Sequence, residues 1–373
     1  MIFGFEIIES KEQYHLVDFT PFLMFDRHGV ARRLRDSKQG TYKIDKSKSA
    51  VELNNTKAFP ENVEFEALLT FSGEAKGNLI RSVSPDPNNV TVIQHHSFIK
   101  LPDSKYKPRK FDPRSGAISI SYMDYSTPID EPITKKYIIR HRLEKKNPEL
   151  EISEAVEPII YYLDPGTPEP VKSALLDGGK WWNQAYESIG FKDSFQVKML
   201  PKDADPLDCR YNVIQWVHRS TRGWSYGASV VDPRTGEIIK GHVSLGSLRI
   251  RQDYMIAQAL TKDPFSTDNQ KNKILELAIA RIRQLSAHEI GHTIGFAHNF
   301  AASSNNRASV MDYPHPLVNV LNGEIVFDDA YDTGIGEWDK VTVAYSYSDF
   351  RSDQNEEFEL NQILENSTKQ GLR

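Results

Sequence analysis

The chain has 373 residues, of which 39% are hydrophobic and 26% charged, a composition typical of a globular protein and not of a disordered, collagenous or coiled-coil one. Its 46 basic and 51 acidic side chains give a formal net charge of −5, which does not favour nucleic acid as a partner. No stretch reaches the roughly 18 consecutive apolar residues of a membrane-spanning helix, so we expect no membrane span. The single cysteine, Cys209, excludes an internal disulfide.

The first part of the chain has the pattern of an antiparallel sheet. Residues 63–71 and 90–99 are rich in β-branched and aromatic side chains, alternate in part, and are bounded by Gly, Pro and Asn. We therefore predict a β-rich N-terminal domain over residues 1–145. The charged composition that follows predicts a linker over residues 146–156, although a solvated helix end would have the same composition.

The remaining residues, 157–373, mix strands and helices. The strand-like segments are 158–163, 195–200 and 211–217, and the helical ones are 171–188, 252–260 and a long one from about 272. The order strand, helix, strand, strand predicts a mixed sheet with a helix covering one face, and the chain as a whole is predicted to be α+β.

The most informative segment of the sequence contains His288, Glu289, His292, Gly295 and His298 in the pattern HExxHxxGxxH. The first two histidines are one helical turn apart, so both imidazoles leave the same side of a helix and can bind one ion. Gly295 can adopt a positive φ, so the chain can leave the helix there and bring back His298 as the third ligand. Three neutral imidazoles leave one coordination position open for water, and we predict one catalytic Zn²⁺.

Glu289 is predicted to be the general base of this site. It follows a ligand in sequence and projects into the same sector without being needed as a ligand, so it can take a proton from the water and pass it to a leaving amine. The predicted reaction is the hydrolysis of peptide bonds. A zinc site kept only for folding is the alternative, but such sites normally have four protein ligands and favour cysteine.

The sequence Ser-Val-Met-Asp-Tyr follows at residues 309–313. An extended histidine motif followed by a methionine turn resembles the metzincin clan of zinc endopeptidases. The resemblance implies that Met311 lies beneath the metal and ligates nothing. It also implies that Tyr313 reaches the metal or the developing oxyanion, although an aromatic residue packed in a turn is the other interpretation of Tyr313.

Four further segments resemble a narrower family, the bacterial exported zinc metalloproteases of the Met-zincin group, which have an EcxA-type zinc-binding domain. These segments are residues 181–185, 212–220, 227–238 and 310–316. The similarity covers residues from about 111 to the C-terminus, and the β-rich region resembles the uncharacterised N-terminal domain of the same family more weakly. The resemblance implies an internal piece of a longer protein with an extracellular or periplasmic location. The sequence itself begins without the basic and apolar regions of a signal peptide.

The same resemblance implies how a peptide or protein substrate binds. The residues Gly227, Ala228, Ser229 and Val230 correspond to an edge strand above the active-site helix, to which an extended peptide would add as a further strand. Asn299, directly after the third histidine, departs from the residues that distinguish the metzincin branches, so the specificity subtype is not assigned.

Two alternatives accompany this interpretation. His218 and His242 lie in the strand region where some metzincins hold a second, structural zinc, but two histidines without a matching cluster do not define a site. The competing function is a catalytically silent or latent zinc-binding or surface-binding module on a metzincin scaffold, in which the β-rich region could cover the cleft.

Overall fold

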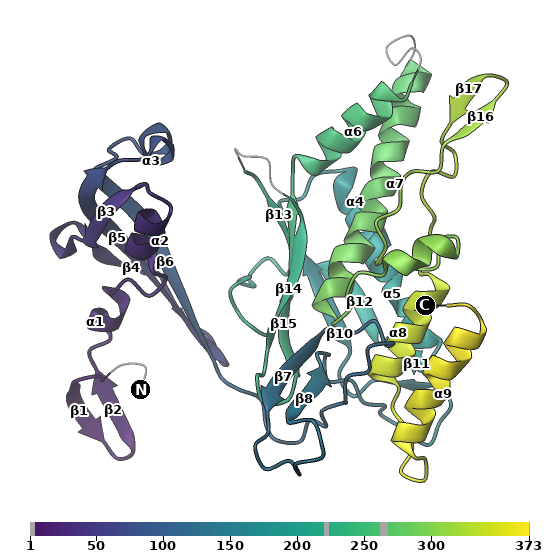
Figure 1. The fold of residues 1–373 in the computed structure, drawn as a ribbon, viewed down its shortest axis with the longest axis horizontal. Helices are drawn as coiled ribbons and strands as arrows, with labels where there is room; N and C mark the ends of the chain where they lie inside the picture. Colours follow the sequence, from purple (N-terminus) through teal and green to yellow (C-terminus); the bar gives the residue numbers. More distant parts are fainter. Residues whose placement is uncertain (1–3, 220–223, 262–267, 373) are drawn as a thin grey trace. The chain divides into compact units, whose positions relative to one another are not determined.

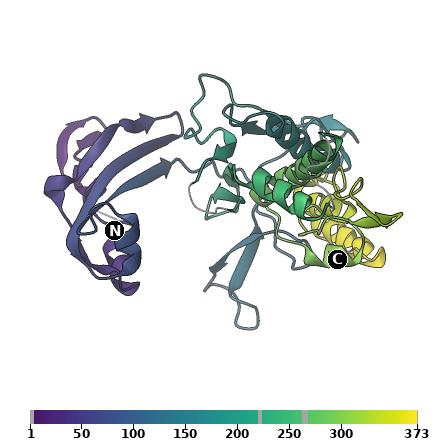
Figure 2. The same ribbon diagram turned by 90° about the horizontal axis from the view of Figure 1, so that it is seen from above.

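A computed structural model describes residues 4–219, 224–261 and 268–372 of the chain (Figures 1 and 2). The chain divides into two compact units. The first consists of residues 1–100 together with 207–209, and the second of residues 101–206 and 210–373. Each unit has a hydrophobic core of its own. In the described part of the chain, no helix is both long and apolar enough to cross a membrane.

The N-terminal unit is built on an antiparallel sheet of β3 (Gly40–Ile44), β4 (Ala50–Ala58), β5 (Asn62–Ala75) and β6 (Asn89–Ile99). One edge of β5 pairs with β6, and its other edge pairs first with β4 and then with β3. Ala67, Leu69 and Phe71 of β5 are fully buried because alternate side chains of a strand share one face. The strands predicted over 63–71 and 90–99, and the β-rich character of this region, are confirmed.

The smaller elements of this unit lie outside the four-stranded sheet. They are β1 (Ile7–Lys11), β2 (Tyr14–Val17), α1 (Thr20–Leu23), α2 (Val30–Asp36), η1 (Lys46–Lys48) and α3 (Asn78–Val83). The first two strands form a separate hairpin. Phe22 and Leu23 of α1 join the buried core of the sheet.

The C-terminal unit contains a five-stranded sheet in the order β12, β10, β13, β15, β14. Its strands are β10 (Ile159–Leu163), β12 (Phe195–Met199), β13 (Asn212–Val217), β14 (Tyr226–Val231) and β15 (Ile238–Gly246). The first four in spatial order are parallel, and β14 pairs antiparallel with β15 at the edge. The mixed sheet predicted from the sequence is therefore present.

Helices cover one face of this sheet (Figure 1). They include α4 (Val171–Lys180), α5 (Trp182–Glu187) and the long α7 (Asp268–Thr293). The helices α4 and α7 lie side by side, and a Cβ added at Gly178 of α4 would lie 2.0 Å from the carbonyl oxygen of Arg283 on α7. Only glycine permits so close an approach of two helix backbones. The single helix predicted over 171–188 is interrupted at Trp181, whose N–H bonds the carbonyl three residues back.

The other elements of this unit are short or lie toward the C-terminus. They are β7 (Ser119–Met123), β8 (Thr134–Ile138), β9 (Ser153–Glu154), β11 (Phe191–Lys192), α6 (Arg249–Ala259), η2 (Phe300–Ser304), β16 (Asn319–Leu321), β17 (Glu324–Val326), α8 (Glu337–Tyr347) and α9 (Glu356–Lys369). The pairs β7 with β8 and β16 with β17 form hairpins.

The division into units falls earlier in the chain than the domain limit predicted near residue 145. Residues 101–145 lie in the C-terminal unit, and residues 146–156 lie within that unit. The buried guanidinium of Arg109 illustrates the reason, because it donates hydrogen bonds of 2.7 and 2.8 Å to the carbonyls of Tyr345 and Ser348 and one of 2.8 Å to Glu356. Contacts across more than two hundred residues of sequence cannot be read from local composition.

Candidate metal centre

Three histidines converge at the end of α7. His288 and His292 lie one turn apart on the helix, and their ring centroids are 4.9 Å apart. His298 follows the helix, and its ring centroid is 5.2 Å from that of His288 and 4.6 Å from that of His292. One nitrogen from each ring lies within 4.8 Å of the others. Among the described residues, these histidines are the only group of three or more ligating side chains with this geometry.

The chain leaves the helix at Gly295, as its position in the motif predicts. Its φ is +105°, a backbone conformation that side chains with a Cβ rarely adopt. A Cβ at this position would also lie 2.1 Å from the carbonyl oxygen of Ile139. The N–H of Phe296 bonds the carbonyl of Gly291 at 2.9 Å, which closes the turn that brings His298 back toward the helix.

The hydrogen bonds of the imidazoles determine which nitrogens face one another. Nδ1 of His288 lies 2.8 Å from the carbonyl oxygen of Val310, and Nδ1 of His292 lies 2.8 Å from that of Phe296. Because a carbonyl only accepts, both Nδ1 atoms carry the proton and both Nε2 atoms present a lone pair. Such a bond from the second ring nitrogen is the usual way in which a protein orients a histidine ligand.

The Nε2 atoms then have the environment that a zinc ligand requires. Within the described part of the chain, the buried Nε2 of His288 has no hydrogen-bond partner. The Nε2 atoms of His292 and His298 are 3.0 Å apart, so two lone pairs would face each other unless a proton or a cation lies between them. A divalent cation bound by the three Nε2 atoms satisfies all of them, and the residues therefore fit Zn²⁺.

Burial also keeps these imidazoles uncharged. It lowers the pKa of His288 to about 3, with a further contribution from the neighbouring His292. Burial lowers the pKa of His292 and of His298 as well. Neutral imidazole is the form that ligates a metal, so the site does not have to lose protons near neutral pH before it binds one.

Glu289 is a residue of α7, on the part of the helix that packs against β14, and it is 6% exposed. Burial raises the pKa of its carboxyl to about 7, while Arg281 and a hydrogen bond from the backbone amide of Gly227 act in the opposite direction. A Cβ added at Gly227 would lie 2.1 Å from the carbonyl oxygen of Glu289, so the strand passes very close to the helix at this residue. Glu289 is therefore a buried carboxyl that can gain or lose a proton near neutral pH.

Met311 is 1% exposed and lies next to α7. A Cβ added at Gly291 would lie 2.2 Å from its sulfur and 2.7 Å from the ring of Trp182. The side chain therefore packs against the part of α7 that directly precedes His292.

Tyr313 lies on the open side of the cluster. Its ring centroid is 5.1 Å from that of His288 and 4.7 Å from that of His298, and in both pairs the rings are nearly perpendicular. The side chain is 57% exposed. This placement brings the phenol next to two of the three histidines.

Asp339 on α8 is a residue of the site that the sequence interpretation missed. Its fully buried carboxylate accepts hydrogen bonds from the hydroxyl of Ser309 at 2.6 Å and from the amides of Val310 and Gly336 at 2.8 and 2.9 Å. Since the carbonyl of Val310 accepts the Nδ1–H of His288, Asp339 holds the amide of the same residue whose carbonyl orients the first histidine. An acidic residue at the third position of a helix after Gly336 was the available sequence signal, and it indicates only a helix cap.

The residues predicted to form a substrate strand lie in β14. Gly227, Ala228, Ser229 and Val230 form the middle of this edge strand, and Ala228 and Val230 are exposed. The hydroxyl of Ser229 donates a 2.8 Å hydrogen bond to the carbonyl of Thr293 at the end of α7. The edge strand is therefore fixed beside the helix that bears the first two histidines.

The other residues considered from the sequence lie outside this cluster. His218 bonds the hydroxyl of Ser247 at 2.9 Å, and His242 is on β15 with its pKa lowered by burial. Asn299 is buried and caps η2, accepting from the amide of Ala302 at 3.2 Å. Cys209 is buried in the N-terminal unit.

The histidine cluster lies in a part of the chain that is similar to a known family, and the two findings together are consistent with a metzincin-type zinc protease domain. Residues 270–373 match the family model described as Met-zincin, which confirms the resemblance seen in the sequence. Residues 1–146 match a domain of unknown function, DUF5117. No curated protein matches the chain. Because the first family match ends near residue 145 while the compact units divide at residue 100, the domain limits stay a prediction.

Proposed function

We propose that the protein is a zinc-dependent endopeptidase. His288, His292 and His298 would hold the ion through their Nε2 atoms. Bound there, Zn²⁺ supplies a Lewis acid and lowers the pKa of a coordinated water toward about 7. The observation that carries the proposal is the convergence of three ligand nitrogens within 4.8 Å on an extended histidine motif.

Glu289 would act as the general base. Its carboxylate follows a ligand on the same helix and is removed from bulk water, so it can take a proton from the attacking water and return it to the leaving amine. Burial raises its pKa to about 7, which makes it a stronger base than an exposed carboxylate. The amide of Gly227, which bonds the carboxylate, would hold it in place during this transfer.

Substrate would bind along β14. The backbone groups on the free edge of a strand can pair with an extended peptide, and the exposed Ala228 and Val230 would contact its side chains. Tyr313, next to the rings of His288 and His298, would donate its phenolic hydrogen to the oxyanion that forms at the scissile carbonyl. Met311 would support the helix from below. We further propose that the domain has the metzincin fold.

The decisive comparison is between wild type, Glu289→Gln and the control Glu276→Gln. Glu276 lies on the same helix but is exposed. Metal content is measured on each purified protein, and cleavage of a broad peptide library is measured with and without a chelator. We expect one zinc per chain in all three proteins, chelator-sensitive cleavage by wild type and the control, and a loss of about 10² to 10⁴-fold in Glu289→Gln.

Each other outcome has a distinct meaning. Near-normal cleavage by Glu289→Gln would refute the assigned base. Tight binding of one zinc by His292→Ala, or none by wild type, would refute the metal centre. One zinc without cleavage by wild type would favour the catalytically silent or latent zinc-binding module.

A further inference from the structure

The loop that carries His298 packs on a segment from far earlier in the chain. This segment, residues 109–142, lies outside the Met-zincin match at 270–373 and inside the match to the domain of unknown function at 1–146. In the structure it belongs to the compact unit that contains the three histidines. Neither family description connects it with a metal.

The first contact is a pair of backbone hydrogen bonds. The N–H of Ile118 donates to the carbonyl of Gly295 at 2.7 Å, and the N–H of Ala297 donates to the carbonyl of Gly116 at 2.9 Å. Together they form an antiparallel bridge centred on Ala117 and Phe296. The backbone on the N-terminal side of His298 is thus held in place as one strand of a short ladder.

A second strand-like stretch supports the first. The N–H of Ile139 donates to the carbonyl of Ile118 at 2.9 Å. The carbonyl oxygen of Ile139 lies so close to Gly295 that a Cβ added at Gly295 would be 2.1 Å from it. Next to it, Arg140 exchanges backbone hydrogen bonds of 3.1 and 2.9 Å with Gly236 and Ile238 at the start of β15. The loop that carries His298 is thereby tied to the central sheet.

The second contact is indirect and reaches the end of α7 through two tyrosines outside the segment, one on β10 and one on α8. A helix leaves carbonyl groups without intrahelical partners at this end. The hydroxyl of Tyr161 donates to the carbonyl of Thr293 at 3.1 Å, and that of Tyr347 donates to the carbonyl of Ile294 at 2.7 Å. His141 is bonded to both tyrosines. Its Nε2 lies 3.1 Å from the Tyr161 hydroxyl, and its backbone N–H donates to the Tyr347 hydroxyl at 3.1 Å.

The protonation of this buried network follows from its geometry. Because the single hydroxyl hydrogen of Tyr161 points to the carbonyl of Thr293, its oxygen accepts from the Nε2–H of His141. The room for the Tyr161 hydroxyl comes from Gly241, since a Cβ there would lie 2.1 Å from that oxygen. The network is therefore a chain of directed hydrogen bonds from residue 141 to the last turn of the metal-binding helix.

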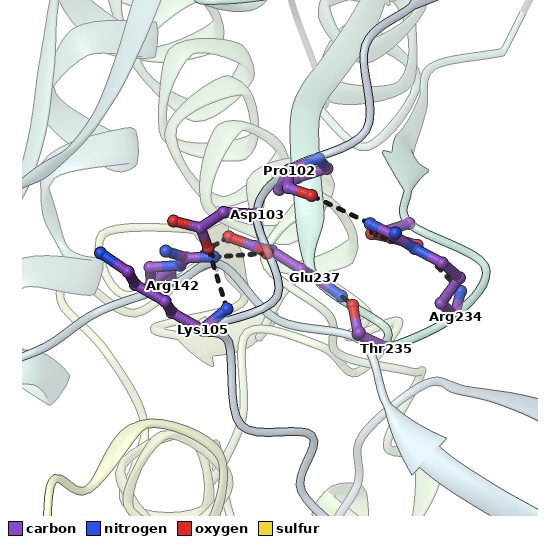
Figure 3. Close-up of polar contacts among 8 residues, drawn as sticks. Pro102, Asp103, Lys105, Arg142, Arg234, Thr235 and Glu237 are labelled. Carbon is purple, nitrogen blue, oxygen red and sulfur yellow. Dashed lines mark hydrogen bonds and ion pairs between the residues drawn. The ribbon is translucent and has the colours of Figure 1, made fainter.

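Ion pairs of Arg142 and a hydrogen bond to Pro102, which precedes the segment, fasten the same region to the turn between β14 and β15 (Figure 3). The guanidinium of Arg142 donates to Glu237 at 2.8 and 3.0 Å and to Asp103 at 2.8 Å. Arg234 donates to the carbonyl of Pro102 at 2.9 Å. The segment is thus anchored before and after the stretches that contact the helix end and the histidine loop.

We propose that residues 109–142 are a positioning element of the metal centre. They hold the last turn of α7 and the loop after Gly295 so that the third ligand stands ready beside the first two. A loop that is ordered before the ion binds does not lose its conformational freedom at that moment, and affinity is higher for that reason. The inference rests on the proposed zinc centre and assigns to part of a domain of unknown function a role in it.

The test uses the whole 373-residue chain with Tyr161→Phe, which removes only the bridging hydroxyl. The matched control is Tyr162→Phe, because Tyr162 is the next residue of β10 and its ring packs on Tyr211. Zinc affinity is measured by competition with a chelator, the absorption spectrum of the Co²⁺-substituted protein reports ligand geometry, and thermal unfolding of the metal-free protein reports stability. In a second pair of variants, His141→Leu removes the side-chain hydrogen-bond donor and His141→Gln retains one.

We expect Tyr161→Phe to weaken zinc binding about tenfold and to alter the Co²⁺ spectrum, as loss of an outer-shell partner does, and Tyr162→Phe to leave both unchanged. His141→Gln should bind zinc more tightly than His141→Leu. A lower melting temperature of the metal-free Tyr161→Phe protein, with unchanged zinc affinity and Co²⁺ spectrum, would overturn the inference. Absence of zinc binding by wild type would instead refute the proposed function.

Discussion

The buried carboxyl of Asp339 makes the stability of the protein depend on pH in a direction that the structure determines. Burial raises its pKa from 3.8 to about 7, although the hydroxyl of Ser309 and the amides of Val310 and Gly336 oppose this. Below about pH 4 the carboxyl is protonated in both the folded and the unfolded chain. As the pH rises, the unfolded chain ionises first, so the folded state loses stability until its own carboxyl ionises near pH 7.

The magnitude follows from the difference between the two pKa values. About three pKa units correspond to an upper limit of about 4 kcal/mol, of which about 2 to 3 kcal/mol falls between pH 5 and 8. Asp339→Asn removes the titration but can keep the bonds, because its oxygen can accept from the two amides and its nitrogen can donate to Ser309. Substitution by alanine would instead leave both amides unpaired.

The assay is thermal unfolding of metal-free wild type and Asp339→Asn at several pH values from 5 to 8. Glu289 and the buried histidines are present in both proteins, so their titrations cancel in the difference between the two curves. We expect the wild type to lose about 3 to 5 °C relative to Asp339→Asn across this range. Parallel curves would refute the reasoning, because they would show that the folded-state pKa of Asp339 is ordinary and that its carboxyl is ionised throughout this range.

Two further predictions concern the chemistry and the geometry of the histidine cluster. The proposed base must be ionised, so kcat/KM should fall as the pH drops below the pKa of Glu289. Burial raises this pKa to about 7, and a bound cation lowers it. A pH profile whose acid limb has its midpoint above 7 would contradict the prediction. Gly295→Ala should cost zinc affinity and more than about 1 kcal/mol of stability, because φ is +105° and the new Cβ would meet Ile139. Gly323→Ala is the control, because Gly323 also has a positive φ, of +81°, but an added Cβ there would have no atom within 4 Å. Equal losses of zinc affinity in the two variants would show that the contact with Ile139 is unimportant.

The elements of the sheet show how much of the fold follows from local pattern. Residues rich in β-branched and aromatic side chains predicted β5 and β6 and most strands of the C-terminal sheet, because these preferences act within a few residues. The domain limit near 145 is predicted from composition in the same way and stays a prediction. The structure places the compact boundary at residue 100, because Arg109 and its neighbours bond groups more than two hundred residues later.

The sequence by itself determined the three histidines and the glycine that turns the chain between them. Their spacing is a property of one helix and one turn, so His288 and His292 face one side in any fold that keeps the helix. The tertiary structure alone decided what holds them. Three contacts do this: the carboxyl of Asp339 bonds the amide of Val310, the amide of Ile118 bonds the loop at Gly295, and the hydroxyl of Tyr161 bonds the end of α7. Each joins distant parts of the chain, and no local periodicity encodes such partners.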